Sequence, residues 1–511
     1  MNLAALVRYW AQWRPEHPAI IFNETTTTWA ELDAQSDAIA RGLRSAGVVK
    51  GDRVGGLLSN RLETPLLTVA TLKLGAIFVP LNFRLTGPEL LPLLEDADCK
   101  VVVTEAEFLD NLELASRQLP FLTFVLDTSK PRPFSDLAIE TGEVPMEEIV
   151  PTDPAFICYT SGTTGRQKGA LLTHLSTMYP GMAKNIAEGL TWRDSIMVAV
   201  PFVFTGAVIS CFVQFAISAG GTMILESDFN IDRYLAVIQK HRVSAATTVP
   251  VVWERLTRSP DFADADISCL ISAACGGAPV SLDLIETYKT KGISLIQSYG
   301  LTEASGLVAT MHGEDATRHI GWAGRAIMGT EIRIADKDMR TSPFGEVGEI
   351  LVKGPHVMQG YWRKPEITAE TIVDGWLRTG DLGVMNEEGF VRLVDRSKDM
   401  LISGGINVYP AEIENALAGI DALADFAIIG VKDADWGEVP MVVAANADGG
   451  EALRLAIERV GDGALAKFKR PKHLVLLGEP LPRTLSGKIS KPALRVRFPE
   501  APHDALALFR K

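Results

Sequence analysis

The sequence predicts an α/β protein with a large N-terminal domain and a smaller C-terminal domain. Three observations carry this prediction. Segments of helical periodicity alternate with short apolar segments up to about Gly329, short segments separated by turn residues follow, and glycines introduce a new helical segment after Asp399. Alternating helices and strands are typical of the α/β class. A chain of 511 residues is also long for one domain, so two or more are expected.

The first elements of the chain follow this alternation. Residues 28–48, "TWAELDAQSDAIARGLRSAGV", place apolar or small side chains on one helical face, and Gly47 fits the end of that helix. The expected face consists of Trp29, Leu32, Ser36, Ile39, Ala40 and Leu43. A strand is expected in residues 52–59, a helix in 63–76 and a second strand in 77–82.

The pattern changes in the last third of the chain. The segments "TEIRIAD", "GEVGEILVKG" and "GFVRLVDR" predict short strands of a small antiparallel or barrel-like subdomain. Residues 399–420, "DMLISGGINVYPAEIENALAGI", predict a helix that starts near Pro410, because proline is favoured in the first helical turn. We therefore expect the main domain boundary near Arg396.

Composition excludes several functional classes. The chain has 50 Lys and Arg against 63 Asp and Glu, a formal charge of -13, which argues against general nucleic-acid binding. Its five cysteines lack the spacing of metal ligands and indicate buried thiols of a reducing compartment. The apolar segment that starts at Ala207 is too short to span a bilayer, so no integral membrane segment is expected. We expect a cytoplasmic protein.

Residues 159–169, "YTSGTTGRQKG", have a composition suited to binding an anion. Apolar segments on both sides are expected to form strands, so the stretch is a loop between them. Backbone N–H groups of a glycine-rich turn, the hydroxyls of Thr160, Ser161, Thr163 and Thr164, and the charge of Lys168 would bind a polyphosphate. The spacing differs from the P-loop, GxxxxGK followed by Ser or Thr.

Five further motifs occur in order along the chain. They are "GGAP" at Gly276, "YGLTE" at Tyr299, "TGD" at Thr379, "DRSKDMLISGG" at Asp395 and "PRTLSGKI" at Pro482. With the phosphate-binding stretch, the set resembles the adenylate-forming enzymes, which include acyl-CoA and aryl-CoA synthetases, amino-acid adenylation domains and firefly luciferase. The resemblance spans nearly the whole chain.

The resemblance implies a fold and a reaction. The implied fold has an N-terminal domain, residues 1–395, made of two α/β subdomains and a small β-barrel-like subdomain. A hinge at 396–399 and a mobile α+β domain at 400–511 follow. A carboxylate attacks the α-phosphorus of ATP, which gives an acyl-adenylate and pyrophosphate, and coenzyme A then takes the acyl group. Both anionic reactants must be screened by cations and fixed donors.

The residues that the resemblance implies for nucleotide binding come mainly from the N-terminal motifs. Phosphate ligands would be Thr160, Ser161, Gly162, Thr163, Thr164, Gly165 and Lys168, with Thr302 near the α-phosphate. Glu303 would bind Mg2+, which prefers oxygen ligands. Adenosine would lie against Gly276, Gly277, Ala278, Ser298, Tyr299 and Gly300, and its ribose against Asp381 and Arg396.

The resemblance also assigns roles in the C-terminal part. Lys488 would bridge the attacking carboxylate and the α-phosphate, and Lys398 would be the hinge residue about which the domain rotates. Ser403, Gly404 and Gly405 would border the pantetheine tunnel. Trp436 and Phe468 would hold the adenine of coenzyme A, with Arg470 and Lys472 near its phosphates. A solvated basic turn with a core tryptophan is the alternative for this last group.

One region of the sequence limits the class of carboxylic acid that the protein would accept as substrate. No acidic residue occurs between Pro201 and Ala219, which disfavours an amino-acid substrate because its ammonium would be left unpaired. Phe204 stands where many related ligases have a histidine. An apolar pocket for a fatty, alicyclic or aromatic acid is expected from Phe202, Val203, Phe204, Cys275, Leu307 and Trp322.

Three other interpretations stay open at this point. A stand-alone adenylating enzyme would load an external carrier protein instead of coenzyme A. A luciferase-like oxygenase shares the adenylation half of the reaction. A non-catalytic nucleotide-binding regulator would be expected to lack Lys488 or Glu303, and this chain has both. The sequence does not decide the oligomeric state, and a homodimer is one possibility.

Overall fold

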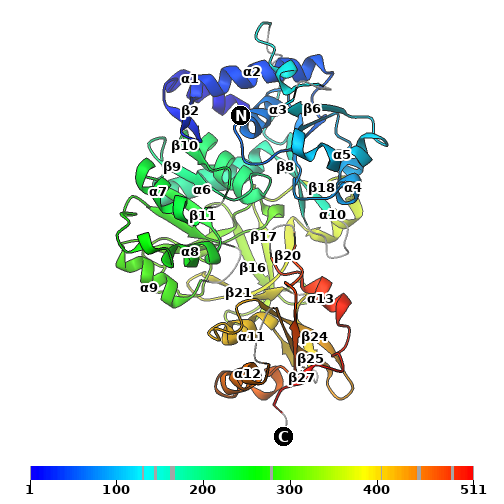
Figure 1. The fold of residues 1–511 in the computed structure, drawn as a ribbon. Coiled ribbons are helices and arrows are strands. Elements are labelled where there is room, and N and C mark those ends of the chain that lie inside the picture. Colours follow the sequence, from blue (N-terminus) through cyan, green and yellow to red (C-terminus); the bar gives the residue numbers. More distant parts are fainter. Residues whose placement is uncertain are drawn as a thin grey trace. The chain divides into compact units, whose positions relative to one another are not determined.

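The computed structural model divides the chain into two compact units (Figure 1). It describes residues 2–128, 132–142, 147–160, 167–228, 230–276, 280–396, 398–403, 406–445, 450–484 and 488–509. The first unit contains residues 1–332, 352–378 and 389–391, and the second contains 333–351, 379–388 and 392–511. The short strands between residues 333 and 388 thus group partly with the C-terminal residues. The boundary near Arg396 stays a prediction.

A seven-stranded sheet forms one part of the first unit. Its order is β18 (Gly360–Tyr361), β8 (Lys168–Thr173), β7 (Pro154–Thr160), β4 (Ile77–Pro80), β3 (Arg53–Leu57), β5 (Val101–Glu105) and β6 (Leu122–Leu126). Strands β4, β3, β5 and β6 are parallel, whereas β7 and β8 form an antiparallel hairpin. The predicted strands on both sides of the phosphate-binding stretch are therefore confirmed.

The helices near the N-terminus include the two that were predicted over residues 28–48 and 63–76. They are α1 (Leu3–Trp13), α2 (Trp29–Ser45), α3 (Glu63–Lys73), α4 (Gly87–Ala97) and α5 (Leu109–Ser116). Helix α2 begins with a capping box between Thr28 and Glu31, which satisfies backbone N–H groups of its first turn. All six residues of the predicted apolar face of α2 are buried, and Gly47 after the helix has a φ of 87°.

A nine-stranded sheet forms the other part of the first unit. Its order is β15 (Arg325–Ala326), β14 (Ala309–Thr310), β13 (Leu295–Tyr299), β12 (Ser272–Cys275), β11 (Ala245–Thr248), β9 (Ser195–Val198), β10 (Thr222–Leu225), β1 (Pro18–Phe22) and β2 (Thr25–Thr28). Helices α7 (Ile231–His241), α8 (Pro250–Thr257) and α9 (Leu282–Thr290) cover one face around the buried rings of Trp253 and Tyr288 (Figure 1). Strands β11, β12 and β13 are parallel, so their carboxyl ends meet at one edge.

Two closely packed helices, α6 (His174–Glu188) and η3 (Gly206–Ile217), also belong to this unit. A Cβ at Gly181 of α6 would lie 2.2 Å from the carbonyl oxygen of Gln214, so only glycine permits this approach. The η3 segment is a π-helix and is mostly buried. Across the described ranges, no helix combines the length and apolarity needed to cross a bilayer.

Shorter strands follow these sheets. A five-stranded sheet has the order β16 (Glu331–Ala335), β17 (Gly348–Lys353), β20 (Trp376–Met385) and β19 (Ile372–Val373), with β21 (Val391–Arg396) paired to β20. Helix α10 (Pro365–Thr371) lies between β18 and β19 in the chain. The three segments predicted as short strands correspond to β16, β17 and β21.

The C-terminal residues form an α+β layer within the second unit. The sheet order is β23 (Ile406–Val408), β22 (Leu401–Ser403), β25 (Gly437–Ala445), β26 (His473–Leu477) and β27 (Leu506–Ala507), with β24 (Phe426–Asp433) paired to β25. Two apolar clusters lie on this sheet and include residues of α11 (Pro410–Leu417), α12 (Gly450–Ala464) and α13 (Lys491–Arg497). Helix α11 starts at the predicted proline.

The five cysteines are free thiols. Four of them are buried, and Cys269 is partly buried. Burial raises the pKa of Cys99, Cys158 and Cys211 to about 12. These thiols are protonated at neutral pH and behave as small apolar side chains, as predicted.

Candidate active site

The hairpin of β7 and β8 carries the phosphate-binding stretch. Thr160 pairs with Lys168 at its end, while Ser161, Gly162, Thr163, Thr164 and Gly165 lie outside the described residues. The Tyr159 hydroxyl donates to Asp96 Oδ2 at 2.8 Å, and burial, then the Asp96 charge, raises the pKa of Tyr159. A Cβ at Gly169 would lie 2.5 Å from Ile157 Cγ2. Glycine at this position therefore leaves room for the Ile157 and Tyr159 side chains of the paired strand.

The chain after β13 makes a tight turn that includes the short 3-10 helix η5 (Thr302–Ala304). The Gly306 N–H donates to the Leu301 carbonyl at 2.9 Å, and a Cβ at Gly300 would lie 2.0 Å from the Gly306 oxygen. The motif "YGLTE" thus needs its glycine to close the turn. The hydroxyls of Thr302 and Thr205 lie 3.0 Å apart, which ties this turn to the segment "PFVFT".

Tyr361 brings the hairpin and the turn together, although the sequence analysis did not select it. Its hydroxyl donates to Glu303 Oε1 at 2.9 Å, and the Lys168 ammonium lies 5.1 Å from the centre of its ring. Strand β18, which carries Tyr361, pairs antiparallel with β8. The predicted phosphate lysine and the predicted metal carboxylate are therefore neighbours of one aromatic side chain.

The predicted adenosine residues lie at the carboxyl ends of β12 and β13. Cys275 pairs with Gln297, and the Ser298 hydroxyl lies 3.4 Å from the Cys275 carbonyl oxygen, beside Gly276. Tyr299 is nearly buried at the end of β13. Gly277 and Ala278 lie outside the described residues. This edge of a parallel sheet is where ligands bind in open α/β folds.

The donor set at Glu303 fits a magnesium ion that the nucleotide also holds. Tyr361 contacts one carboxylate oxygen, and Glu303 is only half-buried, so the carboxylate retains acceptor capacity. No group of three or more His, Cys, Asp or Glu in the described part of the chain could hold a metal by itself. A Mg2+ at Glu303 would thus need phosphate and water oxygens, which this cation commonly takes.

The six residues predicted to line the acid pocket occupy different surroundings. Phe202 is fully buried against Phe212, with ring centres 5.6 Å apart, and Cys275 lies in the core under helices α7 to α9. Trp322 packs beside the cluster of Ala274, Ile296, Met311 and Ala316, and Leu307 beside Ala183 and Ile327. Val203 and Phe204 are half-buried. The pocket assignment stays a prediction.

Asn60 fixes the segment that carries these phenylalanines, and sequence reasoning missed it. Its side-chain amide donates to the carbonyls of Val200 and Glu226 at 3.0 and 2.9 Å, and its Oδ1 accepts from the Phe202 N–H at 2.6 Å. The residue is buried. A lone asparagine after a strand gives no signal of such distant partners.

Several predicted residues of the second unit lie close together. Arg396 Nε lies 2.6 Å from Asp381 Oδ1, and Asp381 is buried. The ammonium of Lys488 is near both groups. Desolvation of this amine, then the Arg396 charge, lowers the pKa of Lys488 from 10.5, although the residue as a whole is exposed. The charge of Asp381 acts in the opposite direction and raises this pKa. The predicted ribose carboxylate and catalytic lysine are therefore electrostatically coupled.

The predicted hinge residue Lys398 also interacts electrostatically with Arg396 and Asp381. Desolvation, then the Arg396 charge, lowers its pKa from 10.5. Arg495 of α13, which the sequence analysis did not select, donates to the Lys398 carbonyl at 3.0 Å and to Asp399 Oδ1 at 2.9 Å. The backbone beside the hinge position is thus held by an arginine near the chain end.

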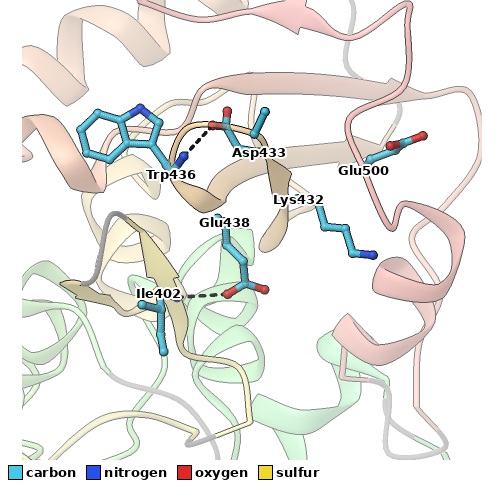
Figure 2. A pocket seen from close by; sticks show the side chains of 8 residues that line it. Ile402, Lys432, Asp433, Trp436, Glu438 and Glu500 are labelled. Carbon is cyan, nitrogen blue, oxygen red and sulfur yellow. Dashed lines mark hydrogen bonds between the residues drawn. The ribbon is translucent and has the colours of Figure 1, made fainter.

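A groove of about 800 Å3 lies beside Trp436 in the second unit (Figure 2). Its lining includes Lys432 but also Asp433, Glu438 and Glu500. Figure 2 shows the Asp433 side chain turned back toward the backbone of Trp436. Its Oδ1 accepts a hydrogen bond from the Trp436 backbone N–H at 3.0 Å. The groove is therefore acidic on balance, and it does not by itself favour a polyphosphate.

The residues predicted to bind coenzyme A separate into two groups. The Lys472 ammonium lies 4.9 Å from the centre of a Trp436 ring and 3.6 Å from Asp433 Oδ2. Arg470 instead pairs with Asp462 at 2.5 Å, and Phe468 on η6 (Lys467–Lys469) packs against the C-terminal core. Ser403 is buried and pairs with Gly437, while Gly404 and Gly405 lie outside the described residues.

Comparison with protein families gives the relationship of this chain. Residues 7–362 match the AMP-binding enzyme family, and residues 412–488 match the AMP-binding enzyme C-terminal domain. The chain belongs to the AMP-binding enzyme family. The resemblance drawn from the ordered motifs is thereby confirmed.

Two similar proteins are named for different carboxylic acids. A feruloyl-CoA synthase of Amycolatopsis sp. is 38% identical over 494 residues, which cover 96% of this chain and 97% of that protein. A long-chain-fatty-acid–CoA ligase of Mycobacterium tuberculosis is 34% identical over 500 residues, with coverage of 97% and 98%.

A solved structure of an AMP-binding enzyme agrees with the fold. The O-succinylbenzoate coenzyme A synthetase of Bacillus subtilis, in complex with ATP and magnesium ion, superposes with a TM-score of 0.85. It is 30% identical and covers 96% of this chain and 99% of its own. The predicted α/β architecture with a smaller C-terminal part is confirmed by this likeness.

Proposed function

We propose that this protein is an ATP-dependent carboxylic acid–CoA ligase. It joins an apolar acid to AMP with release of pyrophosphate, and then transfers the acyl group to coenzyme A with release of AMP. The observation that carries the proposal is the convergence of Lys168 and Glu303 on Tyr361 in the first unit, with Thr302 next to Glu303 in the same turn.

The first half-reaction, formation of the acyl-adenylate, depends on the side chains that offset the charge of the triphosphate. The ammonium of Lys168 and the hydroxyls of Thr160 and Thr302 offset the negative charge of the triphosphate, so an anionic carboxylate can approach the α-phosphorus. Mg2+, when bound, supplies further charge neutralisation, and Glu303 is its ligand from this chain. Gly276 leaves the flat base room beside Ser298 and Tyr299.

Lys488 supplies the remaining cation. Its amine bridges the incoming carboxylate and the α-phosphate, and it must be protonated to do so. Asp381, which binds the ribose with Arg396, also favours the protonated form of Lys488 by its charge. Lys398 acts as the hinge that allows the C-terminal domain to serve the second half-reaction.

Coenzyme A is the acceptor best supported. The two relatives above are named as a CoA synthase and a CoA ligase, and both align with nearly the full chain. Trp436 with Lys472 offers an aromatic face and a cation for a nucleotide, with Ser403 on the neighbouring strand. Arg470 and Phe468, also predicted for this role, contact Asp462 and the C-terminal core instead.

The acid is apolar and aromatic or fatty. The named substrates of the relatives are of these two kinds, and Leu307 with Ala183 and Ile327 offers an apolar wall beside the turn that carries Thr302. Phe204 makes this wall more apolar, at a position where many related ligases have a histidine. A carrier protein as acceptor is the alternative, which the names of the relatives do not favour.

A substrate panel tests the proposal directly. The purified protein is incubated with ATP, Mg2+ and straight-chain, benzoic, cinnamic and alicyclic acids, with and without coenzyme A, and products are identified by mass spectrometry. Thioesters that require coenzyme A support the ligase and identify its acid. AMP esters that persist with coenzyme A present would exclude it as acceptor, and the absence of any AMP ester would refute the proposal.

A further inference from the structure

Tyr361 makes two kinds of contact that no sequence motif assigned. Its hydroxyl donates to Glu303 Oε1 at 2.9 Å, and its ring centre lies 5.1 Å from the Lys168 ammonium. Glu303 and Lys168 come from different segments, the turn after β13 and the start of β8. One side chain therefore touches both the carboxylate and the cation expected to hold the triphosphate.

The backbone around Tyr361 is fastened to the same two segments. The Met358 N–H donates to the Glu303 carbonyl at 2.8 Å, and the Trp362 N–H donates to the Gly169 carbonyl at 2.8 Å. The Tyr361 N–H itself donates to Thr368 Oγ1 at 2.8 Å. Three hydrogen bonds thus fix where the tyrosine ring can lie relative to Lys168 and Glu303.

We propose that Tyr361 is a positioning residue that aligns the Glu303 carboxylate with the Lys168 ammonium for a metal–triphosphate complex. The inference rests on the proposed function, since it concerns the same nucleotide site. Its chemistry has two parts, one for the phenol hydroxyl and one for the aromatic ring.

The hydroxyl restricts rotation of the carboxylate. A hydrogen bond to Oε1 leaves Oε2 as the oxygen best able to coordinate a divalent cation. The same bond fixes the plane of the Glu303 carboxylate. Partners that orient a metal ligand in this way commonly change metal affinity when they are removed. The ring acts separately, because a cation over an aromatic face is attracted to it, and the long lysine side chain is thereby restrained.

The two parts can be separated by substitution. Tyr361→Phe keeps the ring beside Lys168 and removes the hydroxyl, whereas Tyr361→Leu removes both. Tyr288→Phe is the matched control, since it removes a buried hydroxyl that donates to the Trp253 carbonyl at 2.9 Å, within the core under α7 to α9.

The test measures equilibrium binding without turnover. Each full-length variant is titrated with MnCl2 in the presence of α,β-methylene-ATP, and free Mn2+ is followed by electron paramagnetic resonance. Binding of the analogue without metal is measured by calorimetry. For Tyr361→Phe we expect Mn2+ affinity of the nucleotide complex to fall about tenfold, with metal-free nucleotide affinity unchanged. Tyr361→Leu should weaken both, and Tyr288→Phe neither.

The outcomes distinguish this inference from the proposed function. Equal Mn2+ affinity in wild type and Tyr361→Phe overturns the positioning role while leaving the nucleotide site intact. A loss in Tyr361→Phe that Tyr288→Phe matches also overturns it, because general destabilisation then explains the result. If the wild-type protein binds neither the analogue nor Mn2+, the proposed function fails and this inference fails with it.

Discussion

Replacement of Asn60 by alanine is expected to loosen the segment that carries three residues of the proposed acid pocket. The asparagine side chain bonds three backbone groups, the carbonyls of Val200 and Glu226 and the N–H of Phe202. It is only 3% exposed, so water cannot easily replace these bonds. Asn60→Ala therefore removes three partners at once from a buried loop.

The size of the effect follows from those bonds. Each intramolecular hydrogen bond contributes roughly 1 kcal/mol net, so Asn60→Ala should lower the free energy of unfolding by about 3 kcal/mol. The restrained segment also carries Phe202, Val203 and Phe204, three of the six residues proposed to line the acid pocket. Loss of the restraint should therefore raise the KM for the acid several-fold, whereas the KM for ATP should change little.

Urea unfolding and steady-state kinetics check both parts. Asn230→Ala serves as control, because Asn230 is an exposed N-cap of α7 whose loss is expected to lower stability by only about 1 kcal/mol, with no change in KM. A decrease for Asn60→Ala no larger than that of the control, together with an unchanged KM for the acid, would refute the reasoning.

Three further predictions concern the second unit. Lys488→Ala should lower the adenylation rate by about 100-fold or more, while thioester formation from supplied acyl-AMP is largely retained; equal loss of both would contradict its assigned role. Because the pKa of Lys488 is lowered from 10.5 and its protonated form is required, adenylation should fall as pH rises through a value below 10.5, and Lys488→Arg should abolish that decline in the pH–rate profile. Lys398→Pro should block the hinge, so that acyl-AMP forms but thioester does not, and unchanged overall turnover would count against the hinge assignment.

Much of the fold could be predicted because local patterns decide it. The apolar face of α2, from Trp29 to Leu43, repeats at helical spacing, and Pro410 marks the start of α11 by its fixed φ. The π-helix η3 was not predicted. Its residues are apolar on every side, so the sequence carries no periodicity that distinguishes it from a strand or an ordinary helix.

Candidate site residues could be proposed where a motif is continuous, but not where the contacts are distant. Glu303 and Lys168 lie in motifs, but Tyr361 reaches Glu303 across 58 positions, and β18 is a strand of only two residues. Arg495 reaches Lys398 across 97 positions. Such partners follow from the packed fold, and no short pattern encodes them.

The position of β18 has a consequence for synthesis of the chain. Strand β8 is complete at Thr173, but its neighbour β18 begins only at Gly360, which pairs with Leu171, 189 residues later. At typical rates of translation this interval lasts roughly 10 to 40 s. During that time the outer edge of the phosphate-binding hairpin has unpaired N–H and C=O groups that can attract strands of other chains. The nascent protein is therefore open to misassociation at the strand that carries Lys168, the predicted phosphate ligand.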